Sequence, residues 1–163
     1  MNVSATEPVI REMRADELSE IVNLWTLLLQ HHQSLDQRLY QSGRAPTQNY
    51  EQWVKRRLRE DGAKIWVAEF EGQLVGYLLG MVGYRLPTYQ VRTVGMICDL
   101  VIRPEHRRKA IGSRLVEQVI FAFLNQGIEC IQVNYDVDNL EARAFWTSMG
   151  FDSRLVEAYR QLG

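Results

Sequence analysis

The alternation of apolar and polar positions changes period several times along the chain, and each period predicts a secondary-structure element. Apolar residues that return every three or four positions mark one side of an amphipathic helix. This spacing begins after Asp16, a predicted N-cap, and again at Thr47, a second predicted cap. It recurs twice more, so the sequence predicts four helices, over 16–29, 47–58, 111–126 and 139–149.

Shorter runs rich in β-branched and aromatic residues predict strands between these helices. Glu71 and Gly72 separate two of the runs and predict a tight hairpin. The stretch 31–46 loses periodicity and predicts an irregular connection. The predicted strands are 8–13, 64–70, 73–84, 94–102 and 129–135, with one or two closing strands in 151–162. This order predicts an α/β (α+β) fold with a mixed, mostly antiparallel sheet of six to seven strands flanked by four helices.

Composition limits the kinds of protein that fit this pattern. A chain of 163 residues with 46% hydrophobic residues is long enough for one packed domain, which we expect to cover 1–163 with its core in 9–162. The net charge of −1 disfavours a dedicated nucleic-acid binder. The sequence lacks a long apolar run, so we expect no membrane partner and a cytoplasmic location. Cys98 and Cys130 lie in apolar runs without metal-ligand spacing, which predicts reduced, buried thiols and no metal.

The clearest chemical signal is the stretch "RPEHRRKAIGSRL", residues 103–115, where a predicted strand runs directly into a predicted helix. The first backbone N–H groups of a helix are unpaired and lie at the positive end of its dipole, which favours phosphate. Pro104 ends the strand, and Gly112 permits close approach of a ligand. Arg107 and Arg108 add charge. We therefore predict a pyrophosphate site, the alternative being arginines that only solvate a helix end.

Two motifs resemble signatures of the GNAT superfamily of N-acetyltransferases. "DLVIRPEHRRKAIGSRL" is similar to the first signature through Arg107, Ala110 and Gly112. "NLEARAFWTSMGF" is similar to the second, and the matching residues are Asn139, Ala142, Phe145, Trp146, Gly150 and Phe151. The predicted element order extends this resemblance over residues 9–162. Within the superfamily, "CDLVIRPEHRR" most resembles the polyamine acetyltransferases.

The resemblance implies acetyl-CoA as co-substrate, no metal, and direct attack of an amine on the thioester, so that Cys98 is not required as a nucleophile. The acceptor would be a primary amine of a small molecule or peptide, and a homodimer is implied. The backbone of Leu100, Val101 and Ile102 would bind the pantetheine arm, with Asn139, Ala142 and Phe145 on its other side. The implied pyrophosphate cradle comprises Arg107, Arg108, Lys109, Ala110, Ile111, Gly112 and Ser113.

The sequence departs from the family pattern at two positions. Ala110 replaces a glycine of the phosphate loop, which is tolerable where φ is negative and awkward where φ is positive. Trp146 stands where many members have a tyrosine thought to protonate the departing thiolate, and an indole has no acidic proton to give. We place Trp146 at the catalytic end of the site as a packing wall.

An amine of pKa about 10.4 is almost entirely protonated at neutral pH, so a base or a desolvating pocket must help it react. Asp99 is the first candidate base, acting through a water, because a carboxylate within an apolar strand needs a reason. The alternative is that Asp99 faces solvent or pairs with an arginine. Glu69 is the second candidate, and for it we favour a solvent-facing position. The remaining candidates are His31 and His32, of which at most one should face the site, and the acceptor-wall residues Leu35, Asp36, Arg38 and Tyr40.

Three functions therefore compete. The leading one is an N-acetyltransferase, and the second is a non-catalytic acyl-CoA-binding module, suggested by Trp146. Nucleic-acid binding through "VKRRLRE" and "EHRRKA" is the third, and the balanced charge disfavours it.

Overall fold

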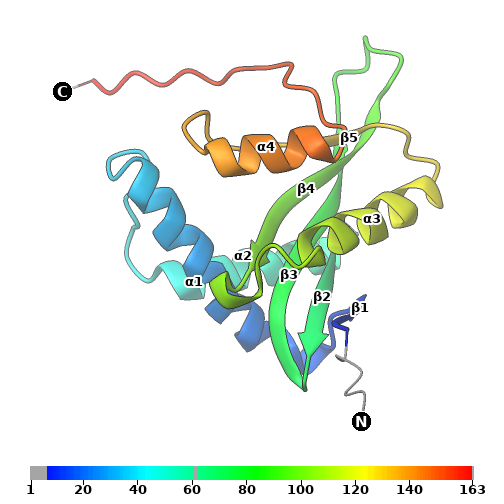
Figure 1. The fold of residues 1–163 in the computed structure, drawn as a ribbon. Coiled ribbons are helices and arrows are strands. Elements are labelled where there is room, and N and C mark those ends of the chain that lie inside the picture. Colours follow the sequence, from blue (N-terminus) through cyan, green and yellow to red (C-terminus); the bar gives the residue numbers. More distant parts are fainter. Residues whose placement is uncertain (1–6, 61, 163) are drawn as a thin grey trace.

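A five-stranded sheet forms the centre of the computed structural model, which describes residues 7–60 and 62–162. Four strands pair antiparallel in sequence order, and the fifth joins the last of them in parallel. Figure 1 shows the strands twisting through the middle of the molecule. The strands are β1 (Val9–Glu12), β2 (Lys64–Phe70), β3 (Gln73–Tyr84), β4 (Thr93–Ile102) and β5 (Ile131–Val133).

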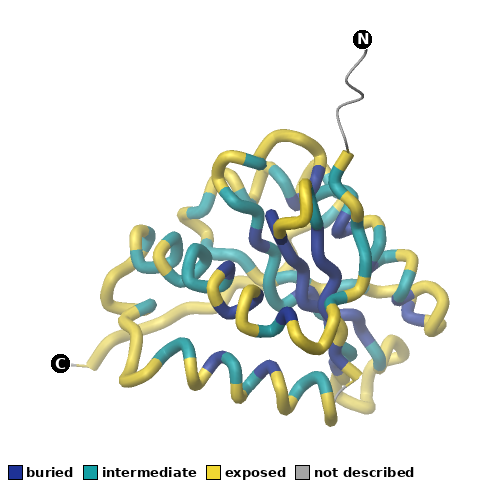
Figure 2. The backbone as a smooth tube through the Cα atoms, turned by 90° about the horizontal axis from the view of Figure 1, so that it is seen from below, coloured by how far each residue is buried: buried dark blue, intermediate teal, exposed yellow. Residues whose placement is uncertain are grey.

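Helices cover both faces of this sheet (Figure 1). Apolar side chains of α1 and α2 pack on one face, while those of α3 and α4 pack on the other, which gives two hydrophobic cores. Figure 2 shows the buried positions concentrated along the central strands between these layers. The α+β class and the four helices are confirmed: α1 (Leu18–Leu35), α2 (Pro46–Glu60), α3 (Ile111–Leu124) and α4 (Leu140–Ser148).

The predicted count of six to seven strands is wrong, because residues 151–162 form no strand. This segment leaves the domain as an extended chain beyond α4 (Figure 1). Phe151 at its start packs on Trp146, but the apolar side chains further along are exposed: Leu155, Val156, Tyr159 and Leu162 are 90%, 81%, 67% and 82% exposed. The apolar alternation is real, but no strand in residues 7–60 and 62–162 pairs with it.

Three local predictions also differ from the structure. Helix α1 continues to Leu35, so the irregular connection starts later than predicted. Strand β5 covers only Ile131–Val133, which leaves Cys130 exposed rather than buried. Cys98 is half-buried, and both thiols are free.

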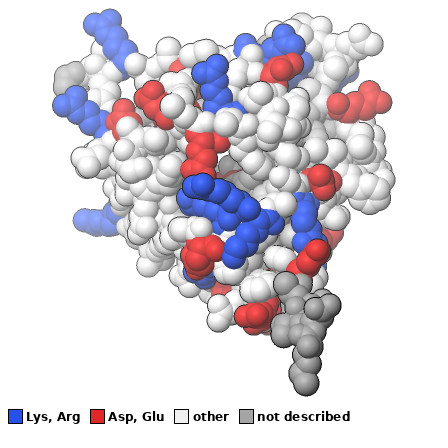
Figure 3. Space-filling view, viewed as in Figure 1, with Lys and Arg blue, Asp and Glu red and all other residues white. Residues whose placement is uncertain are grey.

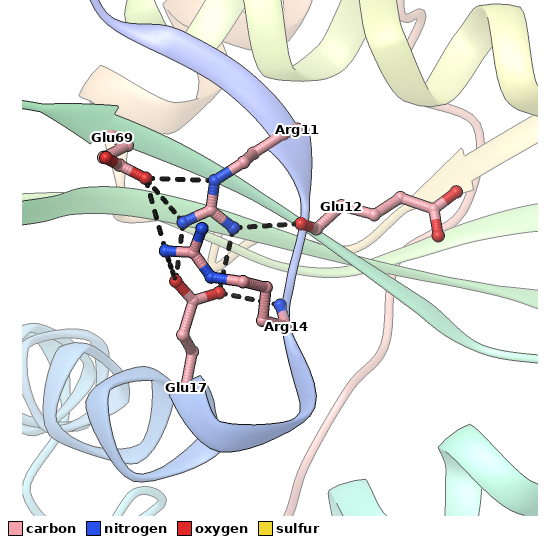
Figure 4. A network of polar contacts seen from close by, with 5 residues as sticks. All are labelled: Arg11, Glu12, Arg14, Glu17 and Glu69. Carbon is pink, nitrogen blue, oxygen red and sulfur yellow. Dashed lines mark hydrogen bonds and ion pairs between the residues drawn. The ribbon is translucent and has the colours of Figure 1, made fainter. Parts of the chain in front are cut away.

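An ion-pair network ties β1 to the start of α1 and to β2 (Figure 4). Arg11 on β1 donates to Glu17 over 2.5 and 2.9 Å and to Glu69 over 2.6 Å. Glu17 also accepts the backbone N–H of Arg14. It therefore caps the short 3-10 turn Ala15–Glu17 that precedes α1, in place of Asp16. The hydrogen bond from Arg11 holds the pKa of Glu17 at about 2. Glu69 is thus committed to structure and is not positioned as a base.

Candidate functional site

A cleft opens where β4 and β5 separate. The two strands pair only through Gly95–Ile97 and Ile131–Val133, although β3 follows β4 as far as Ile102. The side of β4 that would face β5 is therefore unpaired from Cys98 to Ile102. The cleft holds about 360 Å³, which is a usual size for a ligand site. It is bordered by β4, by the loop that leads into α3, by the end of α1 and by α4.

A β-bulge at Cys98 decides which way the next side chain points. Leu79 lies opposite Asp99 and Gly80 opposite Ile97, so Cys98 is the extra residue. Residues two apart on a regular strand share a face, but the bulge breaks this rule here. Ile97 packs in the core below α3, whereas Asp99 meets residues of the core below α1 and α2.

Asp99 lies half-buried in the cleft beside two tyrosines. Tyr50 of α2 donates its hydroxyl to Oδ2 of Asp99 over 2.6 Å, and Tyr77 of β3 lies 3.4 Å from the same oxygen. Burial raises the pKa of Asp99 to about 6, and the two phenol hydrogen bonds oppose a further rise. A carboxylate of this kind can exchange a proton near neutral pH.

The loop from β4 to α3 is bent by two residues in the left-handed region. Arg108 and Ala110 both have φ of 57°, and α3 begins directly afterwards at Ile111. Ala110 therefore adopts the conformation in which glycine is preferred, at a cost of about 1–2 kcal/mol. Figure 3 shows basic side chains gathered near the middle of this face, over the loop that joins β4 to α3. Backbone bent in this way, at a helix N-terminus and among cations, suits an anion.

The first residues of α4 close the opposite side of the cleft. Asn139 caps the helix, because its Oδ1 accepts the N–H of Ala142 over 3.0 Å. Its Nδ2 lies 3.0 Å from Nε2 of His31 on α1. Phe145 and Trp146 follow on the same helix and line the cleft, and Trp146 packs edge-on against Phe145 and Phe151.

Both histidines of α1 line the cleft, so the prediction that at most one would face it is wrong. The cleft extends over the end of the helix, and the two rings lie 6.4 Å apart. His32 stacks on Tyr40, whose hydroxyl donates to Asp136 over 2.8 Å. Burial lowers the pKa of His32, which favours its neutral form.

Comparison with known proteins now decides the family. The family model for the acetyltransferase (GNAT) family matches residues 23–151. This chain belongs to the GNAT family. It is 26% identical over 139 residues to an uncharacterized N-acetyltransferase of Archaeoglobus fulgidus, covering 85% of this chain and 89% of that one. It is 33% identical over 98 residues to human N-acetyltransferase 8, covering 60% of this chain and 42% of that protein.

Solved structures share the fold. A tetramutant protein of Bacillus halodurans superimposes with a TM-score of 0.82 at 22% identity, covering 94% of this chain and 99% of that one. The aminoglycoside N-acetyltransferase AAC(6')-Iy in complex with CoA gives a TM-score of 0.79 at 16% identity, covering 99% of both chains. With its family and its N-acetyltransferase relatives, the chain is an acetyl-CoA-dependent acyltransferase.

The cleft of this GNAT chain fits a CoA molecule in two respects. The unpaired side of β4 presents main-chain groups to an extended arm. At Gly112, an added Cβ would lie 3.4 Å from the ring of Phe145 and 3.9 Å from Leu100, both of which line the cleft. The missing side chain therefore leaves room inside the cleft, next to the bent backbone at the start of α3.

We predict that Gly112→Val weakens CoA binding by at least about tenfold, or about 1.4 kcal/mol, because its side chain enters this space. The expected result is a raised Kd in calorimetry with an unchanged melting temperature. Gly43→Val, at a position where nothing lies within 4 Å, is the matched control and should leave the Kd unchanged. Unchanged affinity in folded Gly112→Val would place the cradle elsewhere.

Most residues implied by the resemblance meet at this cleft, although their roles stay predictions. Lys109, Leu35, Asp36, Arg38 and Tyr40 are not among its lining residues. The described part of the chain has no helix long and apolar enough to cross a membrane. Within the same part, no three His, Cys, Asp or Glu side chains are grouped to hold a metal. The lining residues from the implied set are Asp99, Leu100, Val101, Ile102, Arg107, Arg108, Ala110, Ile111, Gly112, Ser113, Asn139, Ala142, Phe145 and Trp146.

Sequence reasoning missed the two tyrosines at Asp99 and the acidic residue Asp136. Tyr50 lies on the buried side of α2, where its spacing with apolar neighbours indicates packing and hides the role of its hydroxyl. A buried tyrosine needs a hydrogen-bond partner, and this requirement was the available signal. The sequence gives no indication that the partner would be Asp99, because the bulge at Cys98 sets its direction.

Proposed function

We propose that the chain transfers an acetyl group from acetyl-CoA to a primary amine of a small molecule or peptide. The observation that carries this proposal is the position of Asp99, which lies in the same cleft as the unpaired side of β4. A cofactor held along β4 would present its reactive end beside a carboxylate whose pKa is about 6.

Residues on both sides of the cleft would hold the cofactor. Main-chain groups of Leu100, Val101 and Ile102 would bind its arm as an added strand, while Asn139, Ala142 and Phe145 would contact the other side. The backbone from Arg107 to Ser113 would bind the pyrophosphate, with Arg107, Arg108 and Lys109 adding charge. When bound, acetyl-CoA supplies the activated acetyl group as a thioester.

Asp99 would take the proton that the acceptor amine must lose. A carboxylate with pKa about 6 is ionised at neutral pH and retains more basicity than an ordinary aspartate. Burial raises the pKa of the neighbouring Cys98 to about 12, so its thiol stays protonated and is a poor nucleophile. Both observations support direct transfer to the amine rather than transfer through the cysteine.

Trp146 would shape the reacting end of the cleft. Its side chain is buried between Phe145 and Phe151, and we assign it packing rather than proton transfer. A thiol of pKa about 8.5 departs readily as a thiolate, so strong acid assistance is dispensable. The nitrogen of the amine becomes positively charged when it adds to the thioester carbonyl. The proton it then carries can be transferred to the departing thiolate.

Trp146→Phe should accordingly reduce kcat by less than about tenfold, below the range for loss of a general acid. Any larger effect should appear in KM, because the smaller ring packs the cleft less well. Steady-state kinetics of CoA release measures both quantities. A hundredfold fall in kcat with unchanged stability and CoA affinity would instead make the indole N–H a catalytic donor.

Acidic side chains are among those that line the cleft. Asp136 and Glu141 line it together with Asp99, which favours a cationic amine such as a polyamine. An acceptor screen with acetyl-CoA, covering polyamines, aminoglycosides, amino acids and peptide N-termini, tests the proposal through release of free CoA. CoA binding without release against every amine would favour a non-catalytic acyl-CoA-binding module instead.

We also propose one acetyltransferase domain, a cytoplasmic location in keeping with two free thiols, and a homodimer. The segment 154–162 and β5 support the dimer. Phe151 is fixed by its N–H to the carbonyl of Trp146, and Ser153 contacts the hydroxyl of Tyr135. Beyond them the chain is exposed and extended, while among the described residues β5 pairs with β4 alone and its outer edge is open. Two copies would each add this segment to the other's β5 edge.

Sedimentation should therefore show a dimer, and a variant with Asp at Leu155 and Val156 should sediment as a monomer. The exposed residues Phe121 and Leu124 of α3, changed in the same way, serve as the control, because they lie on a helix rather than on the extended segment. A wild-type monomer at high concentration would refute the homodimer.

A further inference from the structure

The carboxylate of Asp99 is held by side chains that come from two other elements. Tyr50 on α2 and Tyr77 on β3 both reach Oδ2, at 2.6 and 3.4 Å, and their hydroxyls lie 2.9 Å apart. Each phenol has one proton to donate, so Tyr50 donates to Asp99 and Tyr77 can donate either to Asp99 or to the hydroxyl of Tyr50. Both tyrosines are buried, with Tyr50 8% and Tyr77 0% exposed. Within the described part of the chain no hydrogen bond is found to the other carboxylate oxygen, Oδ1.

Packing fixes both phenols in place. The ring of Trp25 on α1 stacks on Tyr50 with a centroid distance of 4.2 Å and an interplanar angle of 7°. Trp53 approaches the same ring at 6.0 Å. Tyr77 is part of β3, opposite Val101 on β4, so the sheet itself holds it. The two hydroxyls therefore have little freedom to rotate away from Asp99.

Both phenols remain donors over the whole range in which Asp99 titrates. Burial and the negative charge of Asp99 raise the pKa of Tyr50 and of Tyr77 far above the usual tyrosine value. A neutral phenol that donates to a carboxylate stabilises its charged form. The tyrosines thus oppose the effect of burial on Asp99.

We propose that Tyr50 and Tyr77 are positioning residues, which bind Oδ2 of Asp99 and leave Oδ1 to take the proton of the acceptor amine. This inference rests on the proposed role of Asp99 as the base. It assigns the two oxygens different tasks: Oδ2 is anchored to the protein, and Oδ1 is available to the cleft. Tyr50 should dominate, since its hydrogen bond is shorter by 0.8 Å (2.6 against 3.4 Å).

Several other titratable groups lie near Asp99. On β4 itself, Cys98 stays a neutral thiol because its pKa is raised. Arg57 of α2 acts electrostatically on Cys98. The remaining groups on this cleft are His31 and His32 of α1, Tyr135 and Asp136 after β5, Glu141 of α4, and His106, Arg107 and Arg108 of the loop before α3. None of these is removed by the substitutions proposed below.

The test is the titration of Asp99. NMR monitors the chemical shift of its side-chain carboxyl carbon against pH in protein labelled with ¹³C-aspartate, and Asp99→Asn assigns the signal. Tyr50→Phe keeps the ring that stacks on Trp25 and removes only the hydroxyl. Its midpoint should rise by about one pH unit, the effect of losing a hydrogen bond worth about 1.4 kcal/mol to a charged group. Tyr77→Phe should shift it less, and Tyr84→Phe, at an exposed site, should not shift it.

Activity gives the second readout. If an amine is acetylated, the acidic limb of the kcat/KM profile should move to higher pH in Tyr50→Phe by the same amount as the NMR midpoint. A merely structural loss would lower kcat/KM at all pH values without moving the limb. Melting curves of each variant show whether it is folded, and Tyr77→Phe replaces Tyr50→Phe if the latter is not.

The outcomes separate this inference from the proposed function. A midpoint that stays in place or falls in folded Tyr50→Phe overturns the positioning role, whatever the activity. A shifted midpoint in a protein that acetylates no amine supports the hydrogen-bond arrangement at Asp99 but overturns both its use as a base and the acetyltransferase proposal. A shifted midpoint with a shifted limb supports both.

Discussion

Asp99→Asn is expected to lower kcat/KM for acetyl transfer by about 10²- to 10⁴-fold, the usual contribution of a general base. The amide keeps the shape of the carboxylate but cannot accept a proton from the amine. CoA affinity should be nearly unchanged, because the cofactor arm would bind the main chain of β4. Loss of activity together with intact CoA binding is the expected pattern.

The same substitution should stabilise the protein above pH 6. The pKa of Asp99 rises from an ordinary value near 3.8 to about 6 on folding. The folded state then binds the proton more tightly, so stability falls as pH rises from about 3.8 to about 6. Above pH 6 the ionised group costs at most about 3 kcal/mol, from 1.36 kcal/mol per pH unit. Asp99→Asn removes this cost.

Urea unfolding at pH 4 and pH 8 measures this effect. The gain in free energy of unfolding should be present at pH 8 and nearly absent at pH 4. Asp152→Asn, at a position where the side chain is 81% exposed, is the matched control for loss of one carboxylate. An active Asp99→Asn enzyme would assign the base elsewhere, and a variant destabilised at pH 8 would contradict the raised pKa.

Glu17→Gln should destabilise the fold by about 3 kcal/mol at neutral pH, the lower end for removing one partner of a buried ion pair. Glu17 is 5% exposed and receives two hydrogen bonds from Arg11. The neutral amide of Gln no longer pairs with the charge of Arg11, which then has only Glu69 as a charged partner. Cofactor affinity should not change in the folded variant, because the network lies outside the cleft.

The pH dependence of stability supplies an independent check. The pKa of Glu17 is lowered from 4.5 to about 2, so its contribution is complete above pH 4.5 and is lost as pH falls towards 2. Glu17→Gln should flatten this part of the curve. Glu12→Gln is the control, since the ion pair of Glu12 with Lys64 is exposed and worth at most about 1 kcal/mol. Equal effects of the two substitutions would show that the network adds nothing beyond a surface pair.

Features encoded in contiguous stretches were predictable from the sequence. The junction around residues 103–115 carries its strand end, its cations and its helix start side by side, so the loop from β4 into α3 follows from local rules. That this loop binds an anion stays a prediction. The sequence alone does not decide whether φ of Ala110 is negative or positive, and the structure shows that it is positive. The hairpin after Glu71 was predictable for the same reason, because two residues determine it.

Features that depend on distant partners were not predictable. Tyr50 is 49 residues from Asp99, and their hydrogen bond exists only because the bulge at Cys98 turns Asp99 towards α2. The strand predicted in 151–162 is absent because it lacks such a partner. This segment has the apolar composition of a strand, but a strand requires a neighbour, and none lies beside it within the described chain.

The unpaired side of β4 leaves a position in the sheet that the proposed cofactor arm would fill. From Cys98 to Ile102 the strand has one partner, β3, and Asp99 lies in this half-supported stretch. An arm bound along β4 would supply the second partner and brace the strand that carries the base. If the arm binds there, we expect the cofactor to bind before the amine, because it would complete the sheet around Asp99.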